Sequence, residues 1–437
     1  MHRVNVFACL LFLAPGLLWA QTKDDVQEQL KALEERIRTL ESEVQVLKAA
    51  QTPAGPAEAA TTAPAVQAPA AAPAEAATAA PPAQAPAAPA QVQLPAGAPL
   101  TPSGPLPVYG GASAAAKVLN PDVSVIGDFI GVGGRNPEQP LPSLEMHESE
   151  VGLQAIIDPY ARGDFFFTFG EQGVGLEEGY ITFTSLPGGF VAKVGKMRSS
   201  FGIVNTLHNH VLPWIDRPLV TENLVGGEDG IDDAGVSVAR ILPAPKGIFL
   251  EATGQVFRGD SDNVFSHTNR SDVSAVGRLR AYRDLTEATN LDLGFSFARG
   301  HNDFGSAYRT QLYDLDATLR WKPLRRAIYH NFLTRTELIW SEREQPSSIQ
   351  RAFGFYTASD YRLNRRWTVG GRYDRSDRAS NAFLTDSGFS GVLTYWPSEF
   401  SQIRGQYRFT RYAGGKDANE LLFQLLFVLG AHGAHPF

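Results

Sequence analysis

Arginines recur at even intervals in two stretches of the chain, Arg278 with Arg280 and Arg404 with Arg408. Successive side chains of a β-strand point to opposite faces, so arginines at even spacing lie on one face. The guanidinium group offers fork-shaped donors suited to phosphate and carboxylate, and a row of such groups is suited to guiding anions. Further basic residues that we assign to this path are Lys196, Arg198, Arg320, Arg335 and Arg372.

Acidic residues on the same kind of stretch offer a second interpretation. From residue 121 onward the chain has 32 Lys and Arg against 37 Asp and Glu, a net charge of −5. Opposite charges on adjacent strands commonly pair. Two interpretations therefore stay open, an anion path or a wall whose arginines are neutralised. The acidic residues concerned are Glu148, Glu150, Asp164, Asp314 and Asp316.

Two histidines, His208 and His210, lie in a stretch that also holds Asp216 and Glu222. Imidazoles together with a carboxylate can bind a divalent metal. Two histidines this close in a loop are more often ordinary polar residues, so we predict no metal site and no cofactor. Scattered Ser, His and Asp residues have no spacing that assembles a catalytic triad, and we predict that the chain is not an enzyme.

The elements that carry these residues are short alternating segments divided by Gly, Pro, Asn and Asp. Between residues 402 and 410 the polar Gln402, Arg404, Gln406, Arg408 and Thr410 share one phase, and Ile403, Tyr407 and Phe409 share the other. Residues 160–169 and 290–297 repeat this pattern. About sixteen such strands begin near residues 122, 145, 160, 176, 190, 231, 248, 273, 290, 307, 331, 351, 366, 387, 401 and 419. The pattern predicts an all-β fold, a transmembrane antiparallel β-barrel over residues 121–437.

The last stretch predicts how the barrel closes. Phe423, Leu425, Phe427 and Leu429 share one phase with the terminal Phe437. A chain that ends on an aromatic after such a strand resembles outer-membrane β-barrels, whose final strand must pair with the first because lipid offers no hydrogen bonds to a free edge. After residue 20 no stretch has eighteen uninterrupted apolar residues, so transmembrane helices are not expected. A soluble β-sandwich or propeller is the alternative.

The connections between the predicted strands fall into two kinds. Short ones lie at 158–159, 185–189, 243–247, 363–365 and 397–398, and longer polar ones at 132–143, 199–230, 258–272, 342–350 and 375–386. Bacterial outer-membrane barrels have short periplasmic turns and long outer loops. Trp321, Trp367, Tyr395 and Trp396 fall near the short turns, and Trp340 and Tyr412 near the long loops, as expected for aromatic girdles.

A barrel of this size encloses an aqueous lumen and predicts passive diffusion of small hydrophilic solutes. The longest connection, residues 199–230, has an apolar run that needs a surface to cover it, so we predict that it folds inward as a constriction loop. A loop that caps the barrel or packs on a neighbouring subunit is the alternative. The residues that we assign to the constriction are His208, His210, Trp214, Asp216, Arg217 and Glu222.

The chain begins with three segments of other composition. Residues 1–20 have one early arginine, an apolar core and Ala20 before the expected cut, which is typical of a secretory signal peptide. The single cysteine, Cys9, lies in this signal, so the mature chain can form no disulfide. Residues 51–120 are rich in Ala and Pro and predict a disordered linker.

Residues 21–50 predict a periplasmic coiled coil, because apolar residues recur at alternating spacings of four and three. The run from Arg36 to Glu41 resembles the pattern of short trimeric coiled coils, which favours a trimer over the dimer that the seam also permits. The oligomerisation residues that we assign are Leu30, Leu33, Arg36, Ile37, Leu40, Glu41, Val44 and Leu47.

The run from Lys193 to Gly202 resembles the phosphate-selective porin O and P family, in which a strand ending in a Gly-Lys-x-x-x-Pro-Phe-Gly-like run leads into the third loop. Ser200 stands here where that pattern has proline. The resemblance implies a sixteen-strand trimeric porin, often with a short N-terminal coiled coil, and passive anion transport.

A second hypothesis comes from another class. The barrel could serve as an anchor in outer-membrane lipid, with the coiled coil and linker as a periplasmic tether that reaches peptidoglycan. Neither hypothesis involves nucleic acid. The transported solute, and whether the pore is open, are not encoded in these patterns.

Overall fold

The computed structural model describes residues 121–170, 173–261 and 264–430, and these form an antiparallel β-barrel. The predicted number of strands, sixteen, is confirmed. The strands are β1 (Asp122–Arg135), β2 (Leu144–Asp158), β3 (Ala161–Gly170), β4 (Gly173–Leu186), β5 (Phe190–Arg198), β6 (Asp232–Leu242), β7 (Ile248–Phe257), β8 (Ser274–Thr286), β9 (Thr289–Asn302), β10 (Gly305–Trp321), β11 (Phe332–Gln345), β12 (Ser348–Arg362), β13 (Trp367–Arg378), β14 (Asn381–Ser398), β15 (Ser401–Tyr412) and β16 (Lys416–Gly430). The segments predicted as signal peptide, coiled coil and linker lie outside the described residues, as do Phe437 and the histidines at 432 and 435.

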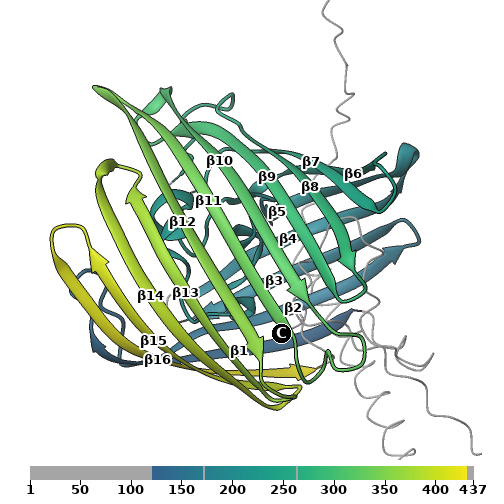
Figure 1. Ribbon diagram of the computed structural model, residues 1–437. Helices are drawn as coiled ribbons and strands as arrows, with labels where there is room; N and C mark the ends of the chain where they lie inside the picture. The colour runs from purple at the N-terminus through teal and green to yellow at the C-terminus, as the bar shows by residue number, and fades with distance from the viewer. Residues whose placement is uncertain (1–120, 171–172, 262–263, 431–437) are drawn as a thin grey trace, which may run out of the picture. The chain divides into compact units, whose positions relative to one another are not determined.

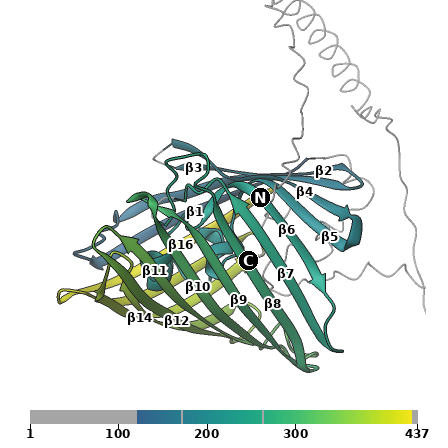
Figure 2. The same ribbon diagram turned by 90° about the horizontal axis from the view of Figure 1, so that it is seen from above.

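The barrel closes through its first and last strands. Each strand pairs with its neighbours in the chain, and β1 pairs antiparallel with β16 from Ser124 opposite Gly430 to Arg135 opposite Asn419 (Figures 1 and 2). This pairing leaves no open strand edge, which is the condition for a sheet to lie in lipid. The closure predicted from the last stretch of the chain is confirmed.

The two faces of the wall differ as the alternation predicts. On β15, Gln402, Arg404 and Gln406 are at most 4% exposed and point inward, whereas Tyr407 is 43% exposed on the outer face. Large apolar side chains continue this outer face round the barrel, among them Phe165, Val236, Leu279, Phe295, Leu315, Val369, Phe389, Leu393 and Phe423. The outside of the barrel is therefore apolar, and polar side chains line much of the inside.

The connections correct one prediction. Residues 342–350 and 375–386, predicted as long loops, lie mostly in strands, because β11 runs to Gln345, β12 begins at Ser348, β13 runs to Arg378 and β14 begins at Asn381. Antiparallel strands can keep pairing beyond the bilayer, so polar residues extend a hairpin there instead of opening a loop. The long connections at this end, the loop end, are 136–143, 199–231 and 258–273.

The opposite end, the turn end, has short connections such as Pro187–Gly189 (η2), with the ten-residue segment 322–331 as an exception. Trp367 and Tyr395 contact each other at this end, with ring centroids 4.6 Å apart. Tyr412 was wrongly predicted for a girdle, because it is 5% exposed and accepts a hydrogen bond from Asn136. None of the helical turns among the described residues is long or apolar enough to cross a membrane.

Candidate functional site: the loop inside the barrel and the charges that hold it

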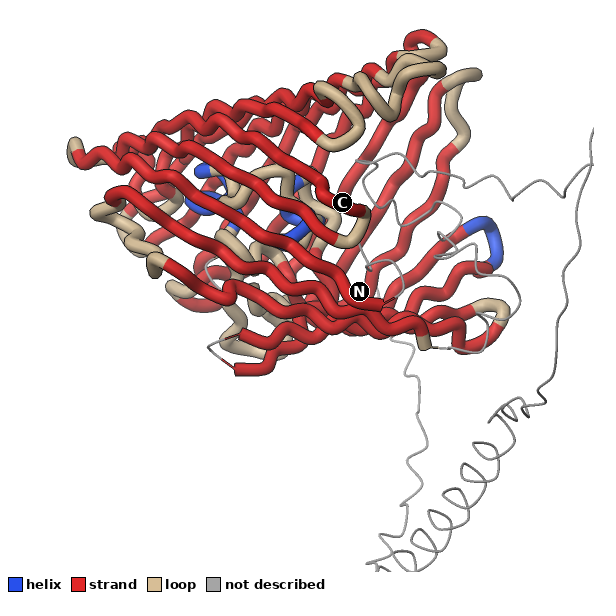
Figure 3. The backbone as a smooth tube through the Cα atoms, turned by 90° about the horizontal axis from the view of Figure 1, so that it is seen from below, coloured by secondary structure: helices blue, strands red, loops and turns tan. Residues whose placement is uncertain are grey.

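The connection between β5 and β6, residues 199–231, folds into the interior of the barrel. It contains the helical turns η3 (Val204–Thr206), η4 (Asn209–Val211) and η5 (Thr221–Val225), which lie within the ring of strands (Figure 3). Its backbone N–H groups donate to inward side chains of strands distant in sequence, from Gly202 to Ser296 at 3.1 Å and from Ile215 to Gln406 at 2.8 Å. We call this segment the inner loop.

Gly202 fixes where the inner loop turns away from the wall. Its φ of +60° lies in the left-handed region, and a Cβ atom at this position would overlap the Glu337 carboxylate. That carboxylate accepts the N–H of Ile203 at 3.0 Å. Glycine therefore lets the backbone approach a charged side chain of β11 closely.

The middle of the inner loop forms an apolar core with the wall. Trp214 is fully buried, and its ring meets that of Tyr356 on β12 edge-on at 5.3 Å. The core also includes Phe201, Val204, Leu212, Val220 and Leu224 of the inner loop, and Leu312, Ile339 and Val392 of the wall. Burying each large apolar side chain contributes about 1.5–3 kcal/mol, so the position of the loop is set by packing as well as by charge.

Arginines of the wall hold the inner loop at one place, which we call the Asp216 pole: Asp216, Arg372 and Arg408. The Asp216 carboxylate accepts hydrogen bonds from Arg372 at 2.9 Å and Arg408 at 3.0 Å. Burial alone would raise the pKa of Asp216, but the two guanidinium groups lower it to about 2. Arg372 also lies over the Trp214 ring, 4.7 Å from its centroid. Charge and apolar packing thus meet at this pole.

The second place is the His208 pole: His208, His210, Glu150, Glu177 and Glu178. Nδ1 of His208 lies 2.7 Å from Glu150, and Nε2 lies 2.9 Å from Glu178. Burial would lower the pKa of His208, but the facing carboxylates raise it well above its usual value. Burial lowers the pKa of His210. The carboxylates nearest to these histidines in the sequence analysis were Asp216 and Glu222, but Asp216 binds Arg372 and Arg408.

Sequence reasoning missed Glu177 and Glu178, since strict alternation places only one of two adjacent residues inside. A β-bulge changes this: Phe166 pairs with Glu178 and Phe167 with Leu176, so Glu177 is the extra residue. Both glutamates are 8% exposed. A second bulge lies on β2, where Asp128 pairs with Glu148 and Phe129 with Met146. No pattern in the sequence marks these two positions.

Most of the basic residues assigned to an anion path lie on the inner face and are paired, whereas Lys196 shares its phase on β5 with Val194, which is 46% exposed. Arg198 binds Glu177 at 2.7 Å, Arg278 binds Asp316 at 2.7 Å, and Arg408 binds Glu420 at 2.6 Å. The other pairs are Lys196 with Asp232, Arg280 and Arg320 with Asp292, Arg335 with Asp360, and Arg372 with Asp374. Arg404 donates instead to the Trp214 carbonyl at 3.1 Å and to Gln424 at 2.8 Å. The neutralised wall is the interpretation that these contacts favour.

The remaining residues assigned to the constriction hold the loop together. Arg217 is 3% exposed and donates to Asn209 at 3.0 Å and to the carbonyl of Leu207 at 2.7 Å. Burial lowers the pKa of Arg217 to about 10 and raises that of Glu222 to about 7. The hydrogen bonds of Arg217 therefore stabilise the fold of the inner loop, whereas burial of the charged Glu222 carboxylate opposes it.

Comparison with known proteins gives one relative in sequence. The chain is 30% identical over 388 residues to an uncharacterized protein of Aquifex aeolicus (strain VF5), covering 74% of this chain and 81% of that protein. The chain belongs to the family of this protein. The match extends over most of both chains, so the family shares more than a short motif. No family model matches the chain.

Solved structures show which known fold the barrel is similar to. The barrel is similar to the anion-selective porin from Comamonas acidovorans, with a TM-score of 0.51 and 11% identity over 70% of this chain and 98% of that one. OmpT, an outer membrane protein of Vibrio cholerae, matches with a TM-score of 0.49 and 10% identity over 70% of this chain and 97% of that one. The first likeness shows that this family member has the fold of an outer-membrane porin.

Proposed function

We propose that this protein is an outer-membrane channel through which small hydrophilic solutes diffuse passively, and that it is not an enzyme. The observation that carries the proposal is a closed sixteen-strand wall with apolar side chains outside and polar side chains inside. Such a wall satisfies its backbone in lipid and is wide enough to enclose water. The inner loop is the proposed constriction, because it lies in the path that a solute would follow.

Conductance of the purified protein in planar bilayers tests this proposal. Discrete current steps support the channel, and their absence in correctly folded protein overturns it. A variant in which residues 203–225 are replaced by a short Gly-Ser linker tests the constriction separately. We expect larger steps from this variant, and unchanged steps would remove the constriction role but leave the channel.

We propose that the channel has weak charge selectivity, because carboxylates balance most of the arginines that an anion path would need. The measurement is the reversal potential in a salt gradient. A value near zero is expected for the native protein, with little change in R404Q and R408Q. A strongly anion-selective value that these substitutions reduce would restore the anion path.

The resemblance of residues 193–202 to phosphate-selective porins stays a prediction. Two of the three cations of this run, Lys196 and Arg198, bind Asp232 and Glu177. Paired cations offer few free donors to phosphate, so we propose small solutes in general and not phosphate in particular. Block of the sodium chloride current by millimolar phosphate would contradict this choice.

We further propose that residues 1–20 direct secretion, that the turn end faces the periplasm, and that residues 21–50 assemble the chains as a trimer through a coiled coil. The sequence pattern around Arg36 and Glu41 supports a trimer over a dimer. Native mass spectrometry in detergent tests the assembly, with Ile37→Asp as the disruptive variant. A monomer or dimer in the native protein would overturn the trimer.

A second candidate function is an envelope anchor, favoured by one observation: the apolar core of the inner loop fills part of the barrel interior. In that case the barrel holds the protein in outer-membrane lipid, and residues 21–120 reach toward peptidoglycan. Folded protein that carries no current in bilayers and sediments with purified peptidoglycan would support the anchor. Conductance without peptidoglycan binding would reject it.

A further inference from the structure

Four buried glutamates and two buried histidines meet where the inner loop contacts β2 and β4. Glu148, Glu150, Glu177 and Glu178 come from the wall and are 1–8% exposed, and His208 and His210 come from the loop and are 1–2% exposed. Within the described part of the chain, Oε2 of Glu148 and Oε1 of Glu150 are buried without a hydrogen-bond partner. Buried carboxylate oxygens without partners are unfavourable, so this cluster has unused capacity to bind a cation.

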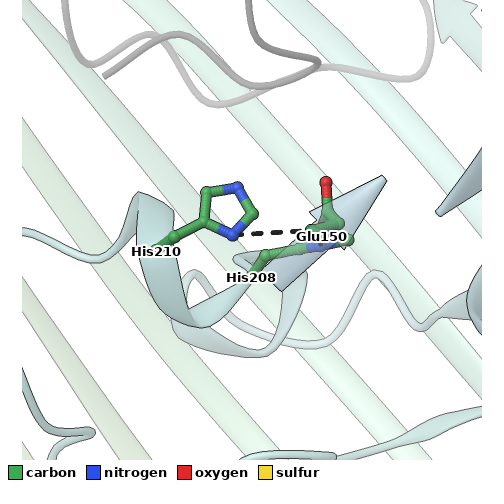
Figure 4. Close-up of side chains that lie close together, drawn as sticks. All are labelled: Glu150, His208 and His210. Carbon is green, nitrogen blue, oxygen red and sulfur yellow. Dashed lines mark hydrogen bonds and ion pairs between the residues drawn. The ribbon is translucent and has the colours of Figure 1, made fainter. Parts of the chain in front are cut away.

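Three of these side chains converge on one point. Oε2 of Glu150 lies 2.7 Å from Nδ1 of His208 and 3.8 Å from Nδ1 of His210 (Figure 4). One donor atom from each of the three residues lies within 4.8 Å of the others. Ligand atoms round a tetrahedral zinc ion, with bonds of about 2.0–2.2 Å, are about 3.3 Å apart. Movement of these side chains that brings the donor atoms toward this separation would make a binding site.

Neighbouring contacts already orient these side chains as they are oriented in metal sites. Nε2 of His208 lies 2.9 Å from Oε2 of Glu178, so this carboxylate can hold the imidazole with Nδ1 turned toward Glu150. A carboxylate behind a ligating histidine is the usual supporting contact in metalloproteins. Glu178 is itself fixed by the backbone N–H of Arg198, which donates to its Oε1 at 2.7 Å.

Glu177 is placed to supply a fourth ligand. Its Oε1 accepts from the Arg198 guanidinium at 2.7 Å, while its Oε2 makes no hydrogen bond among the described residues and lies 3.2 Å from Nδ1 of His208. One oxygen is therefore held, and the other points into the cluster. Glu148, Glu150 and Glu177 also bring their oxygens within 4.8 Å of one another, so further carboxylate ligands are at hand.

We propose that Glu150, His208 and His210 bind a divalent first-row transition metal ion, with Glu177 as the fourth ligand. Imidazole together with carboxylate suits zinc and its neighbours, whereas calcium and magnesium prefer oxygen alone. The bound ion takes the place of the protons that the cluster otherwise shares between imidazole and carboxylate. It fastens the inner loop to β2 and β4, independently of whether the barrel conducts.

Metal binding to the purified full-length protein tests the proposal. The protein is stripped with a chelator and titrated with Zn²⁺ by equilibrium dialysis, and with Co²⁺ by visible absorption, which reports low coordination number and nitrogen ligands. We expect one ion per chain. H210A and E150Q should each weaken binding by at least about 100-fold, because loss of a merely supporting residue already costs about 10–100-fold. H267A is the matched control, because His267 is a loop histidine beside a carboxylate, 3.5 Å from Asp260.

Several outcomes would overturn the site. If the native protein binds neither Zn²⁺ nor Co²⁺, the proposed site is wrong. This test needs no variant, so misfolding of H210A does not affect it. Unchanged binding in folded H210A and E150Q would also overturn the site, with folding judged by heat-dependent mobility in detergent gels. The double variant H432A/H435A should bind as the native protein does. Loss of binding there would assign the ion to the end of the chain instead.

Discussion

The two poles of the inner loop solve the same problem, charge buried inside a barrel, in different ways. At the Asp216 pole one carboxylate lies between Arg372 and Arg408, and the protein supplies both signs of charge. At the His208 pole three glutamates, with Glu148 beside them, meet one guanidinium group, that of Arg198, and two imidazoles. The first pole is complete within the protein, whereas the second needs protons or a cation to balance it.

One loop is therefore attached to the wall at two places, and the buried charges are balanced within the protein at only one of them. A buried ion pair contributes little net stability, but loss of one partner is strongly destabilising. The Asp216 pole should therefore act as a fixed attachment. The His208 pole should depend on what the solution supplies, and substitutions that affect one pole and not the other can separate the two roles.

The largest expected effect comes from Asp216→Ala, which leaves Arg372 and Arg408 without the carboxylate they share. We expect the free energy of unfolding to fall by about 3–5 kcal/mol, the usual result of breaking a buried pair. Urea unfolding of the detergent-solubilised barrel measures it. The control is Asp260→Ala, whose carboxylate is 42% exposed and binds Arg258 at 3.1 Å, with an expected loss of at most about 1 kcal/mol. Equal losses in the two variants would contradict the fixed attachment.

Gly202→Ala should have the next largest effect, because Gly202 forms the turn that precedes both His208 and Asp216 in the inner loop. The left-handed φ and the overlap with Glu337 both oppose a side chain, and strain of this kind costs about 1–3 kcal/mol. Gly254→Ala is the matched control, since a Cβ there meets nothing within 4 Å and the φ is ordinary. Thermal unfolding followed by circular dichroism compares the two variants. A larger loss in Gly254→Ala would show that the inner loop does not depend on this turn.

Most of the fold could be predicted from the sequence, for a physical reason. Successive side chains of a strand face lipid and the barrel interior in turn, so apolar and polar residues alternate with a period of two within each strand. The predicted start of β15, residue 401, and of β1, residue 122, agree with the structure. Starts were less accurate where hairpins extend past the apolar zone, as at β14, which begins at Asn381 and not near residue 387.

The site could be predicted only in part. The apolar run around Trp214 indicated that the loop needs a surface, and the structure gives it Tyr356 and Ile339 as partners. The partners of His208 could not be predicted, because Glu150 and Glu178 are 58 and 30 residues away along the chain. Their meeting depends on a β-bulge at Glu177 and on the register of the strands, which no local pattern encodes.

The pH dependence of stability should differ between two carboxylates of the same loop. Burial raises the pKa of Glu222 to about 7, so the folded loop keeps a proton that an unfolded chain releases near pH 4.3, as usual for Glu. Folded stability from this group is therefore lost as the pH rises from about 4.3 to 7. We expect Glu222→Gln to raise the melting temperature relative to native protein at pH 8 and to leave it unchanged at pH 4.

Asp216 provides the opposite sign for comparison. Its pKa, lowered to about 2 by the arginines despite burial, keeps it charged at both pH values. The loss caused by Asp216→Ala should be nearly the same at pH 8 and pH 4, and should shrink as the pH falls from about 3.9, the usual pKa of an unfolded Asp, toward 2. An Asp216→Ala effect that already shrinks between pH 8 and pH 4, or a Glu222→Gln effect that does not change over this range, would contradict the contrast.

The smallest expected effect concerns the core between the poles. The Tyr356 hydroxyl is buried and has no hydrogen-bond partner among the described residues, whereas that of Tyr412 accepts from Asn136 at 3.1 Å. An unpaired buried hydroxyl has lost its hydrogen bonds to water without replacement, so its removal is favourable for the folded state. Removal of a paired hydroxyl lowers the free energy of unfolding by about 0.5–1.5 kcal/mol. We expect Tyr356→Phe to leave the free energy of unfolding unchanged or slightly raised, and Tyr412→Phe to lower it. Equal losses would mean that water reaches Tyr356, and then the core between the two poles is wet and cannot isolate the charges at one from those at the other.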